Sequence, residues 1–342
     1  MKKFAGFQHG INLGGWFSQC DHTKETYEEF IKEEDFRRIR EWGLDHVRLP
    51  IDYDLVEQKD GTRIEEGFGY LKRAVSWAKK YGLNLVLDLH KTYGYSFDSG
   101  EGEGGFFENE TYQERFYSLW EELARRFSSD TDMLAFELLN EVTEKSYCRE
   151  WNRIAAAAIG RIRKITLDVP ILVGGYYNNS IEALPDLDPP ADEHVIYNFH
   201  CYEPLIFTHQ GAYWVPGMDT SFRLSLDEPY RVLEEKTGQY ITQAVVGFDG
   251  FDPDSALGEE YFDRYFKEAV RIAEERNTAL YCGEYGVIDL ADPEETLKWY
   301  RLISSVFEKY GIGRAAWNYR AKDFGFIDPH MEGVLDEIVT LL

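Results

Sequence analysis

Positive charge is scarce in this chain of 342 residues, which carries 37 Lys and Arg against 62 Asp and Glu and a net charge of −25. Such a surface repels phosphate backbones and anionic lipid headgroups, so we expect neither a nucleic-acid partner nor a membrane surface. Long hydrophobic runs are also missing, because no apolar stretch reaches the roughly 18 residues that a membrane-spanning helix needs. A neutral substrate fits this composition better than a polyanion.

Metal and cofactor motifs are missing as well. The four cysteines form no CxxC pair, and they lie at Cys20, Cys148, Cys201 and Cys282. No HExxH or other His/Cys ligand spacing is present, and no Gly-x-Ser-x-Gly elbow, so we expect no metal and no cofactor. The glycine-rich stretch 100–105 lacks the Lys and Ser/Thr of a phosphate-binding loop, and we interpret it as a flexible loop at the rim of the site.

The remaining composition points to a globular chain that handles sugars. Aromatic residues make up 15% of the sequence, and Tyr and Trp suit a cleft that stacks on the flat faces of sugar rings. The first residues form no hydrophobic signal core, which predicts a cytoplasmic chain with free thiols, or a secreted one whose presequence has been removed. We expect the chain to act as a monomer.

Short apolar runs alternate with longer amphipathic stretches along the whole chain. The predicted strands are 10–13, 44–49, 83–89, 134–139, 170–173, 195–199, 279–282 and 313–317. Helical patterns cover 33–42, 70–81, 110–126, 144–167, 259–276, 294–310 and 332–341, with only a weak signal at 181–187. This alternation indicates parallel strands joined by helices, and eight such strands predict a (β/α)8 barrel of the TIM type.

We predict one catalytic domain over residues 1–342, because no linker or change of composition divides the chain. The connection after the sixth strand is unusually long and spans 203–258. It contains Phe207, Tyr213, Trp214 and Phe222, which is too aromatic for a disordered linker. We expect an inserted subdomain beside the cleft.

Polar or aromatic side chains stand at the ends of six predicted strands. They are Arg48, His90, Asn140 with Glu141, His200 with Tyr202, Glu284 and Trp317. Each has an ordinary structural reading: Glu141 as a helix cap, Arg48 in an ion pair, the histidines as hydrogen-bonded core residues, Trp317 in the core. In a parallel barrel, however, these ends share the face where barrel enzymes carry their chemistry. Their joint placement predicts an active site.

Glu141 and Glu284 supply the two carboxyl groups that glycoside hydrolysis requires. Arg48 beside Glu284 would favour the ionised form that a nucleophile needs, whereas a less polar setting would keep Glu141 protonated as the acid. Asn140 is placed to bind a sugar 2-hydroxyl, and Tyr202 to donate to Glu284. Trp317 would form the floor of the subsite that binds the reacting sugar.

Seven sequence motifs resemble those of glycoside hydrolase family five, the cellulase family, in the order found there and across nearly the whole chain. They are Gly10–Trp16, His46–Pro50, Leu87–His90, Phe136–Glu141, Tyr197–Tyr202, Tyr281–Gly286 and Ala316–Tyr319. Val142 departs from the proline that is common after the Asn-Glu pair, and this change matches the compact endoglucanase C type.

The resemblance implies a retaining double displacement with Glu141 as acid/base and Glu284 as nucleophile. It also implies supporting roles for Arg48, His90, Asn140, His200, Tyr202 and Trp317. In the endoglucanase C type the sixth loop carries a similar insertion, which would place Trp214 beside the cleft.

Three functions follow from these observations. The first is an endo-β-1,4-glucanase acting on cellulose-type or mixed-linkage β-glucan, so that the partner is a β-linked oligo- or polysaccharide. The second uses the same residues for mannanase or exo-β-glucanase activity. The third is a barrel that binds sugar without cleaving it, which the presence of both carboxylates disfavours.

Overall fold

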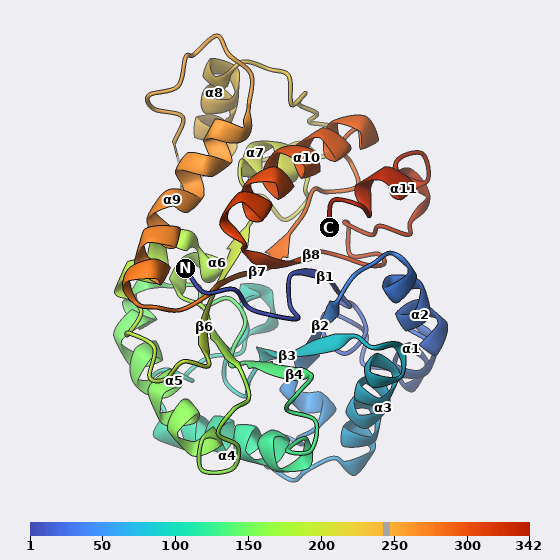
Figure 1. Cartoon of the computed structure of the whole chain (residues 1–342), viewed down its shortest axis with the longest axis vertical. Helices are drawn as coiled ribbons and strands as arrows, with labels where there is room; N and C mark the ends of the chain where they lie inside the picture. The colour runs from blue at the N-terminus through green and yellow to red at the C-terminus, as the bar shows by residue number, and fades with distance from the viewer. Residues whose placement is uncertain (242–246) are drawn as a thin grey trace.

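The computed structural model describes residues 1–241 and 247–342 and shows a closed barrel of eight parallel strands in sequence order (Figure 1). The strands are β1 His9–Asn12, β2 His46–Asp52, β3 Asn84–Lys91, β4 Leu134–Glu137, β5 Ile171–Val173, β6 Val195–Cys201, β7 Leu280–Tyr285 and β8 Gly313–Ala316. β1 pairs with β8 through Gly10–Ala315 and closes the ring. The predicted (β/α)8 barrel is confirmed.

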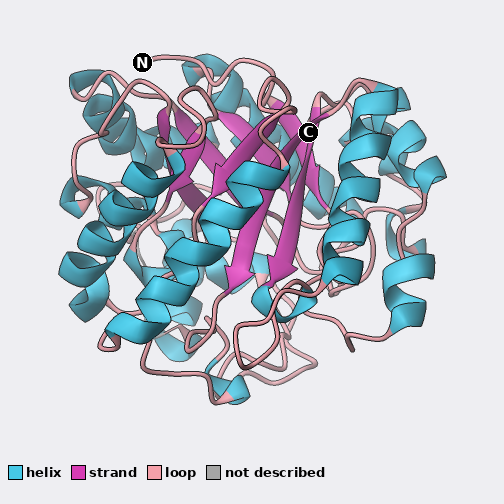
Figure 2. Ribbon diagram, turned by 90° about the horizontal axis from the view of Figure 1, so that it is seen from below, coloured by secondary structure: helices cyan, strands magenta, loops and turns pink. Residues whose placement is uncertain are grey.

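Helices surround the strands, as the side view shows (Figure 2). The α-helices are α1 Lys24–Glu29, α2 Glu33–Glu41, α3 Glu65–Tyr81, α4 Glu110–Arg126, α5 Cys148–Ile162, α6 Tyr176–Asn179, α7 Leu205–Thr208, α8 Tyr230–Tyr240, α9 Glu259–Glu275, α10 Pro293–Tyr310 and α11 Leu335–Ile338. The 3-10 helices are η1 Tyr53–Leu55, η2 Ser99–Glu101, η3 Lys145–Tyr147, η4 Ile181–Asp186 and η5 Pro329–Met331.

Helix α10 shows how local sequence sets these bounds. Its N-cap Asp292 accepts hydrogen bonds from the backbone N–H groups of Glu294 and Glu295, and Pro293 takes the first helical position. Gly311 ends the helix in a left-handed conformation at φ 65°. The chain then enters β8 within two residues.

The connection from β5 to β6 contains no long α-helix. The weak signal at 181–187 corresponds to the 3-10 helix η4 with Pro185 inside it. Proline lacks the N–H that an α-helix would use, so Pro185 disfavours a longer α-helix here. The segment 176–180 lies in this connection, and its Asn178 and Asn179 contact Glu141 and His200.

The interior of the barrel changes from apolar to polar along the strands. Near their amino ends, Val86, Ala135, Ile196 and Tyr281 belong to one small apolar cluster, which Phe4 closes. Side chains two residues further on in a strand face the same side. In β3, β4 and β6 those next positions hold Asp88, Glu137 and Asn198, and they start the polar layer described below.

The long connection 203–258 packs onto the barrel. Tyr230 and Leu233 of α8 are buried and join the main hydrophobic core. Tyr230 stacks on Phe251 with ring centroids 4.7 Å apart and contacts Tyr261 of α9. Residues 242–246 of this predicted insertion lie outside the described part of the chain. Its status as a separate subdomain stays a prediction.

Among the described residues, no helix combines the length and the apolar character needed to cross a membrane.

Candidate active site

Eight of the nine predicted site residues lie on barrel strands or shortly after their carboxyl ends. They are Arg48 in β2, His90 in β3, Asn140 and Glu141 after β4, His200 in β6, Tyr202 after it, Glu284 in β7 and Trp317 after β8. Hydrogen bonds, ring contacts and the approach of His200 Nδ1 to within 3.6 Å of Glu284 join these side chains into one group.

Glu284 is held through both carboxylate oxygens. Arg48 Nη1 donates to its Oε1 at 2.7 Å, and the Tyr202 hydroxyl donates to its Oε2 at 2.8 Å. Burial raises the pKa of the Tyr202 phenol well above its usual value, so this hydroxyl keeps its proton. The carboxylate of Glu284 therefore faces a permanent cation on one side and a fixed donor on the other.

Glu141 has a different environment. Asn178 Nδ2 donates to its Oε2 at 2.9 Å, and His200 Nδ1 lies 2.8 Å from its Oε1. Burial raises the pKa of Glu141 above the usual carboxyl value, while the hydrogen bond from Asn178 opposes that rise. Burial also lowers the pKa of His200 to about 4, so its ring is neutral near pH 7.

The tautomer of His200 follows from its second neighbour. Asn179 Nδ2 lies 3.4 Å from His200 Nε2, so this nitrogen accepts and the ring hydrogen sits on Nδ1. Nδ1 then donates towards Oε1 of Glu141, and it lies 3.6 Å from Oε2 of Glu284. His200 thus stands between the two carboxyl groups.

The two carboxyl groups are close together. One oxygen of Glu141, one of Glu284 and a nitrogen of His200 all lie within 4.8 Å of one another. A sugar carbon bonded to one carboxylate and an oxygen bound by the other can fit across such a gap.

A buried polar layer under the site holds Arg48. Its Nε and Nη2 donate to the two oxygens of Glu137 at 2.7 and 2.8 Å, and its Nη1 donates to Asn12 Oδ1 at 2.9 Å. Asp88 Oδ2 lies 3.1 Å from Nη2, and Asn198 Nδ2 donates to Glu137 Oε1 at 2.8 Å. Burial alone would lower the pKa of Arg48, but Asp88 and Glu137 raise it well above its usual value.

Reasoning from the sequence missed this layer. Its signal is present, because Asp88 interrupts an apolar run between Leu87 and Leu89, and Glu137 does so between Phe136 and Leu138. A charged residue in a strand that is buried on both faces needs a partner inside the barrel. Asn178 was also missed, and it lies in a turn that no strand pattern marks.

Trp317, His90 and Asn140 form the next part of the site. The indole ring of Trp317 lies parallel to the His90 ring, with centroids 6.0 Å apart. Asn140 Oδ1 accepts from Arg48 Nη2 at 2.9 Å, and His90 Nδ1 lies 2.5 Å from Asp88 Oδ2. Burial lowers the pKa of His90.

Trp317 is packed tightly from below. Only 5% of its surface is exposed, and it shares a cluster with Ile288 and Phe324. A Cβ added at Gly14 would lie 2.4 Å from the indole, so a glycine is required there. The position of the ring is therefore well determined, which a stacking surface needs.

Trp214 lies outside this hydrogen-bonded group. It is 40% exposed, and its ring lies 6.4 Å from that of Phe324. Phe324 in turn lies 5.8 Å from the ring of Tyr202. Two rings, Phe324 and Tyr202, thus connect Trp214 to the carboxylate of Glu284.

In the described part of the chain, two groups of side chains have donor atoms close enough for a metal ion. In the first, Glu141–His200–Glu284, the Glu284 oxygens are already bound by Arg48 and Tyr202. In the second, the two nitrogens of His22 face different carboxylates, Asp52 at 3.4 Å and Asp54 at 3.8 Å. Lys91 also lies 3.3 Å from Asp52, so this second group is an ion-pair network. Neither donor set fits a resident metal.

Known proteins resemble this chain over most of its length. The family model Cellulase (glycosyl hydrolase family 5) matches residues 7–323. Cellodextrinase A of Ruminococcus flavefaciens is 49% identical over 314 residues, which cover 92% of this chain and 86% of that protein. Endoglucanase C of Acetivibrio thermocellus is 37% identical over 350 residues, covering 99% and 98%.

Solved structures of Cel5A from Thermotoga maritima resemble the fold of this chain. The Cel5A enzyme of Thermotoga maritima in complex with cellobiose superposes with a TM-score of 0.76 at 25% identity, covering 97% of each chain. A structure of the same enzyme in complex with mannotriose has a TM-score of 0.76 at 25% identity and covers 97% of each chain.

Proposed function

The chain belongs to the cellulase family, glycosyl hydrolase family 5, and from this membership we propose that it is a retaining endo-β-1,4-glucanase with Glu141 as acid/base and Glu284 as nucleophile. The spacing of the two carboxyl groups carries the proposal. Retaining glycosidases place them roughly 5–5.5 Å apart, whereas inverting enzymes need roughly 6.5–9.5 Å to admit a water. One oxygen of Glu141 lies within 4.8 Å of one oxygen of Glu284, which supports the retaining arrangement.

In the first step, Glu284 attacks the anomeric carbon and forms an ester bond to it. The glycosidic bond breaks, and Glu141 donates its proton to the departing oxygen. In the second step, Glu141 takes a proton from water, the water oxygen bonds to the anomeric carbon, and the ester to Glu284 breaks. Two inversions leave the product with the configuration of the substrate.

The environments of the two carboxyl groups support this assignment of roles. Glu284 faces Arg48, which stabilises a negative charge on it. Glu141 is buried against neutral groups, and its raised pKa keeps a proton available for the leaving oxygen. Asn140, which is held by Arg48, would bind the sugar 2-hydroxyl. His90 stacks against Trp317, which would lie under the sugar ring.

We propose β-1,4-linked glucan as the substrate, including mixed-linkage β-glucan. Cellodextrinase A and Endoglucanase C, the relatives named above, support glucan over other polymers. The alternative is mannanase activity, because a structure of T. maritima Cel5A holds mannotriose. Release of reducing sugar from carboxymethylcellulose, barley β-glucan, laminarin and mannan separates these possibilities. The proposal requires the first two to be cleaved fastest.

We further propose that the 203–258 insertion bounds one end of the substrate site and presents Trp214 to a sugar. The exposed face of Trp214 and its contact with Phe324 support this role. Aromatic rings complement the C–H faces of β-linked glucose.

Replacing each carboxyl group separately tests the roles. Glu284→Gly should abolish turnover, and azide should restore cleavage of an activated β-glycoside with an inverted product, because one displacement occurs. Glu141→Ala should still form the glycosyl-enzyme from substrates with good leaving groups, and azide should give a retained product. Products released by the parent enzyme should be β by proton NMR. A first-formed α product, or exchanged azide stereochemistries, would refute the proposal.

A further inference from the structure

Three consecutive residues of α6, next to the site, have a left-handed backbone, so this element is a left-handed turn and not a regular α-helix. Tyr177, Asn178 and Asn179 have φ values of 52°, 57° and 56°. For non-glycine residues this conformation is strained, and asparagine tolerates it better than other residues. A run of three is kept only if the surrounding contacts enforce it, and such strain is concentrated at functional sites.

The backbone of this turn is bound to the segment that follows Glu141. The N–H groups of Tyr177 and Asn178 donate to the carbonyls of Thr143 and Val142 at 3.1 and 3.0 Å. Glu141 itself has φ 38°, and its carbonyl accepts from the Tyr95 hydroxyl at 2.7 Å. The turn and the Glu141 segment therefore form one rigid unit.

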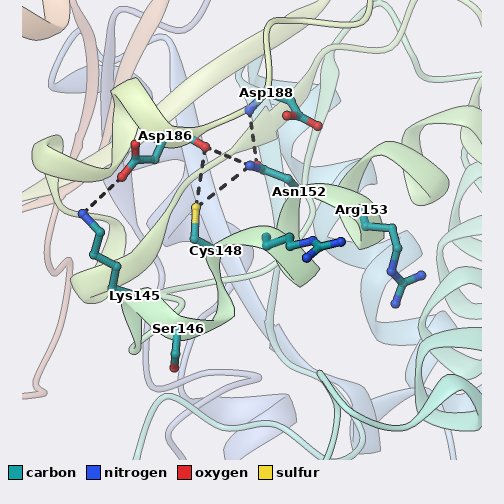
Figure 3. A pocket seen from close by; sticks show the side chains of 8 residues that line it. Lys145, Ser146, Cys148, Asn152, Arg153, Asp186 and Asp188 are labelled. Carbon is teal, nitrogen blue, oxygen red and sulfur yellow. Dashed lines mark hydrogen bonds and ion pairs between the residues drawn. The ribbon is translucent and has the colours of Figure 1, made fainter.

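The outer side of the turn is anchored too. The hydroxyl of Tyr176 donates to Asp186 Oδ2 at 2.6 Å, and Lys145 Nζ lies 3.2 Å from the same oxygen. Figure 3 shows Lys145 reaching towards Asp186 at the wall of a surface pocket of about 550 Å³. This ion pair joins the chain after β4 to the end of η4 behind the turn.

Two side chains of the turn contact Glu141 and His200. Asn178 Nδ2 donates to Glu141 Oε2 at 2.9 Å. Asn179 Nδ2 sets the tautomer of His200, whose Nδ1 lies 2.8 Å from Glu141 Oε1. Both oxygens of Glu141 are thus oriented from this turn, one directly and one through His200.

We propose that Asn178 is a positioning residue for Glu141, and that its amide holds the carboxyl group in the orientation that protonates the glycosidic oxygen. This inference rests on the proposed function above. An amide is suited to the position, because it donates to the carboxyl group in both protonation states and adds no charge. Aspartate would place a second negative charge there, and glycine would leave Oε2 without this donor.

The backbone conformation of Asn178 makes a clean test possible. Glycine adopts a positive φ without strain, so Asn178→Gly removes the amide and preserves the turn. Asn178→Asp is the isosteric second variant. Asn277→Gly is the matched control, since Asn277 has φ 52° and lies between α9 and β7, at the opposite end of the barrel.

The measurement is kcat/KM against pH for each variant, on a cello-oligosaccharide and on an aryl β-cellobioside with a good leaving group. We expect Asn178→Gly to lose about tenfold on the oligosaccharide, the equivalent of one hydrogen bond, and less than about twofold on the aryl glycoside. The alkaline limb of the curve of kcat/KM against pH should move to higher pH, because the lost donor favoured the ionised form of Glu141. Asn178→Asp should move it further, and Asn277→Gly should match the parent.

Equal losses on both substrates with an unmoved alkaline limb would overturn the inference and leave Asn178 a structural residue. Such a result with an active parent leaves the proposed function intact. A parent that cleaves neither substrate would overturn the proposed function and this inference together.

Discussion

The substitution Tyr202→Phe removes one hydrogen bond and little else. The hydroxyl donates to Glu284 Oε2 at 2.8 Å. The ring packs edge-on against His209 and Phe324, with centroids 5.2 and 5.8 Å apart, and phenylalanine keeps those contacts. The variant therefore isolates the effect of this donor on the nucleophile.

The two chemical steps should respond differently. A hydrogen bond to a charged group contributes about 1.5–3 kcal/mol, which corresponds to about 10- to 150-fold in rate. While Glu284 attacks, its charge is transferred to the departing group and the bond from Tyr202 weakens. When the ester breaks, the carboxylate re-forms and the bond strengthens. The loss should therefore fall mainly on breakdown of the glycosyl-enzyme.

An activated aryl β-cellobioside makes this visible, because its first step is fast. We expect kcat and KM to fall together by about 10- to 150-fold, with a burst of aryl alcohol, while kcat/KM changes much less. Tyr310→Phe is the control, since Tyr310 donates to Asp263 at 2.7 Å on the outer helices. A variant without a burst, in which kcat/KM falls as far as kcat, would refute the reasoning.

Three other perturbations have defined outcomes. Trp317→Ala should lower kcat/KM on cello-oligosaccharides by at least about tenfold, and an unchanged value would assign the ring to packing alone. Shortening the 203–258 insertion to a turn should change KM and product lengths more than hydrolysis of a small aryl glycoside, and product patterns like the parent's would contradict its role. His22 has its pKa raised to about 10, chiefly by Asp52, so its stabilising contribution is complete below pH 6.5 and is lost as the pH rises towards 10. The Tm difference between the parent and His22→Gln should therefore shrink from pH 6 to pH 10, and a constant difference would exclude this pairing.

The alternation of strands and helices was enough to predict the barrel, because parallel strands buried on both faces give continuous apolar runs. The carboxyl ends of several strands were placed too early. His200 and Glu284 were expected just after their strands, and they lie within β6 and β7. The apolar run of the sequence ends where the barrel interior becomes polar, but the strand itself continues. Polar side chains can follow there because they form hydrogen bonds inside the barrel, as Asn198 Oδ1 does with the backbone N–H of Gly283.

The site was predictable where it depends on strand ends and was not where it depends on loop geometry. Arg48, Glu141 and Glu284 could be placed together because all parallel strands finish on one face. Asn178 could not, since its contact with Glu141 depends on a left-handed turn. Short turns of this kind are determined by tertiary hydrogen bonds, and a single sequence contains little trace of them beyond the paired asparagines.

The two carboxyl groups are supported in ways that match the different tasks proposed for them. Glu284 sits on a barrel strand and is bound by Arg48, a permanent cation that stabilises negative charge on its carboxylate. Glu141 follows its strand on a loop with an unusual backbone, and among the described residues its only ion-pair partner is His200, whose pKa is lowered to about 4. A carboxyl group that first donates a proton and then accepts one must be able to adopt both its protonated and its ionised form. A permanent cation beside Glu141 would favour its ionised form. Hydrogen bonds from neutral groups orient the carboxyl group without favouring that form as strongly. The difference between an arginine at one carboxyl group and an asparagine at the other is therefore the feature from which their roles are best argued.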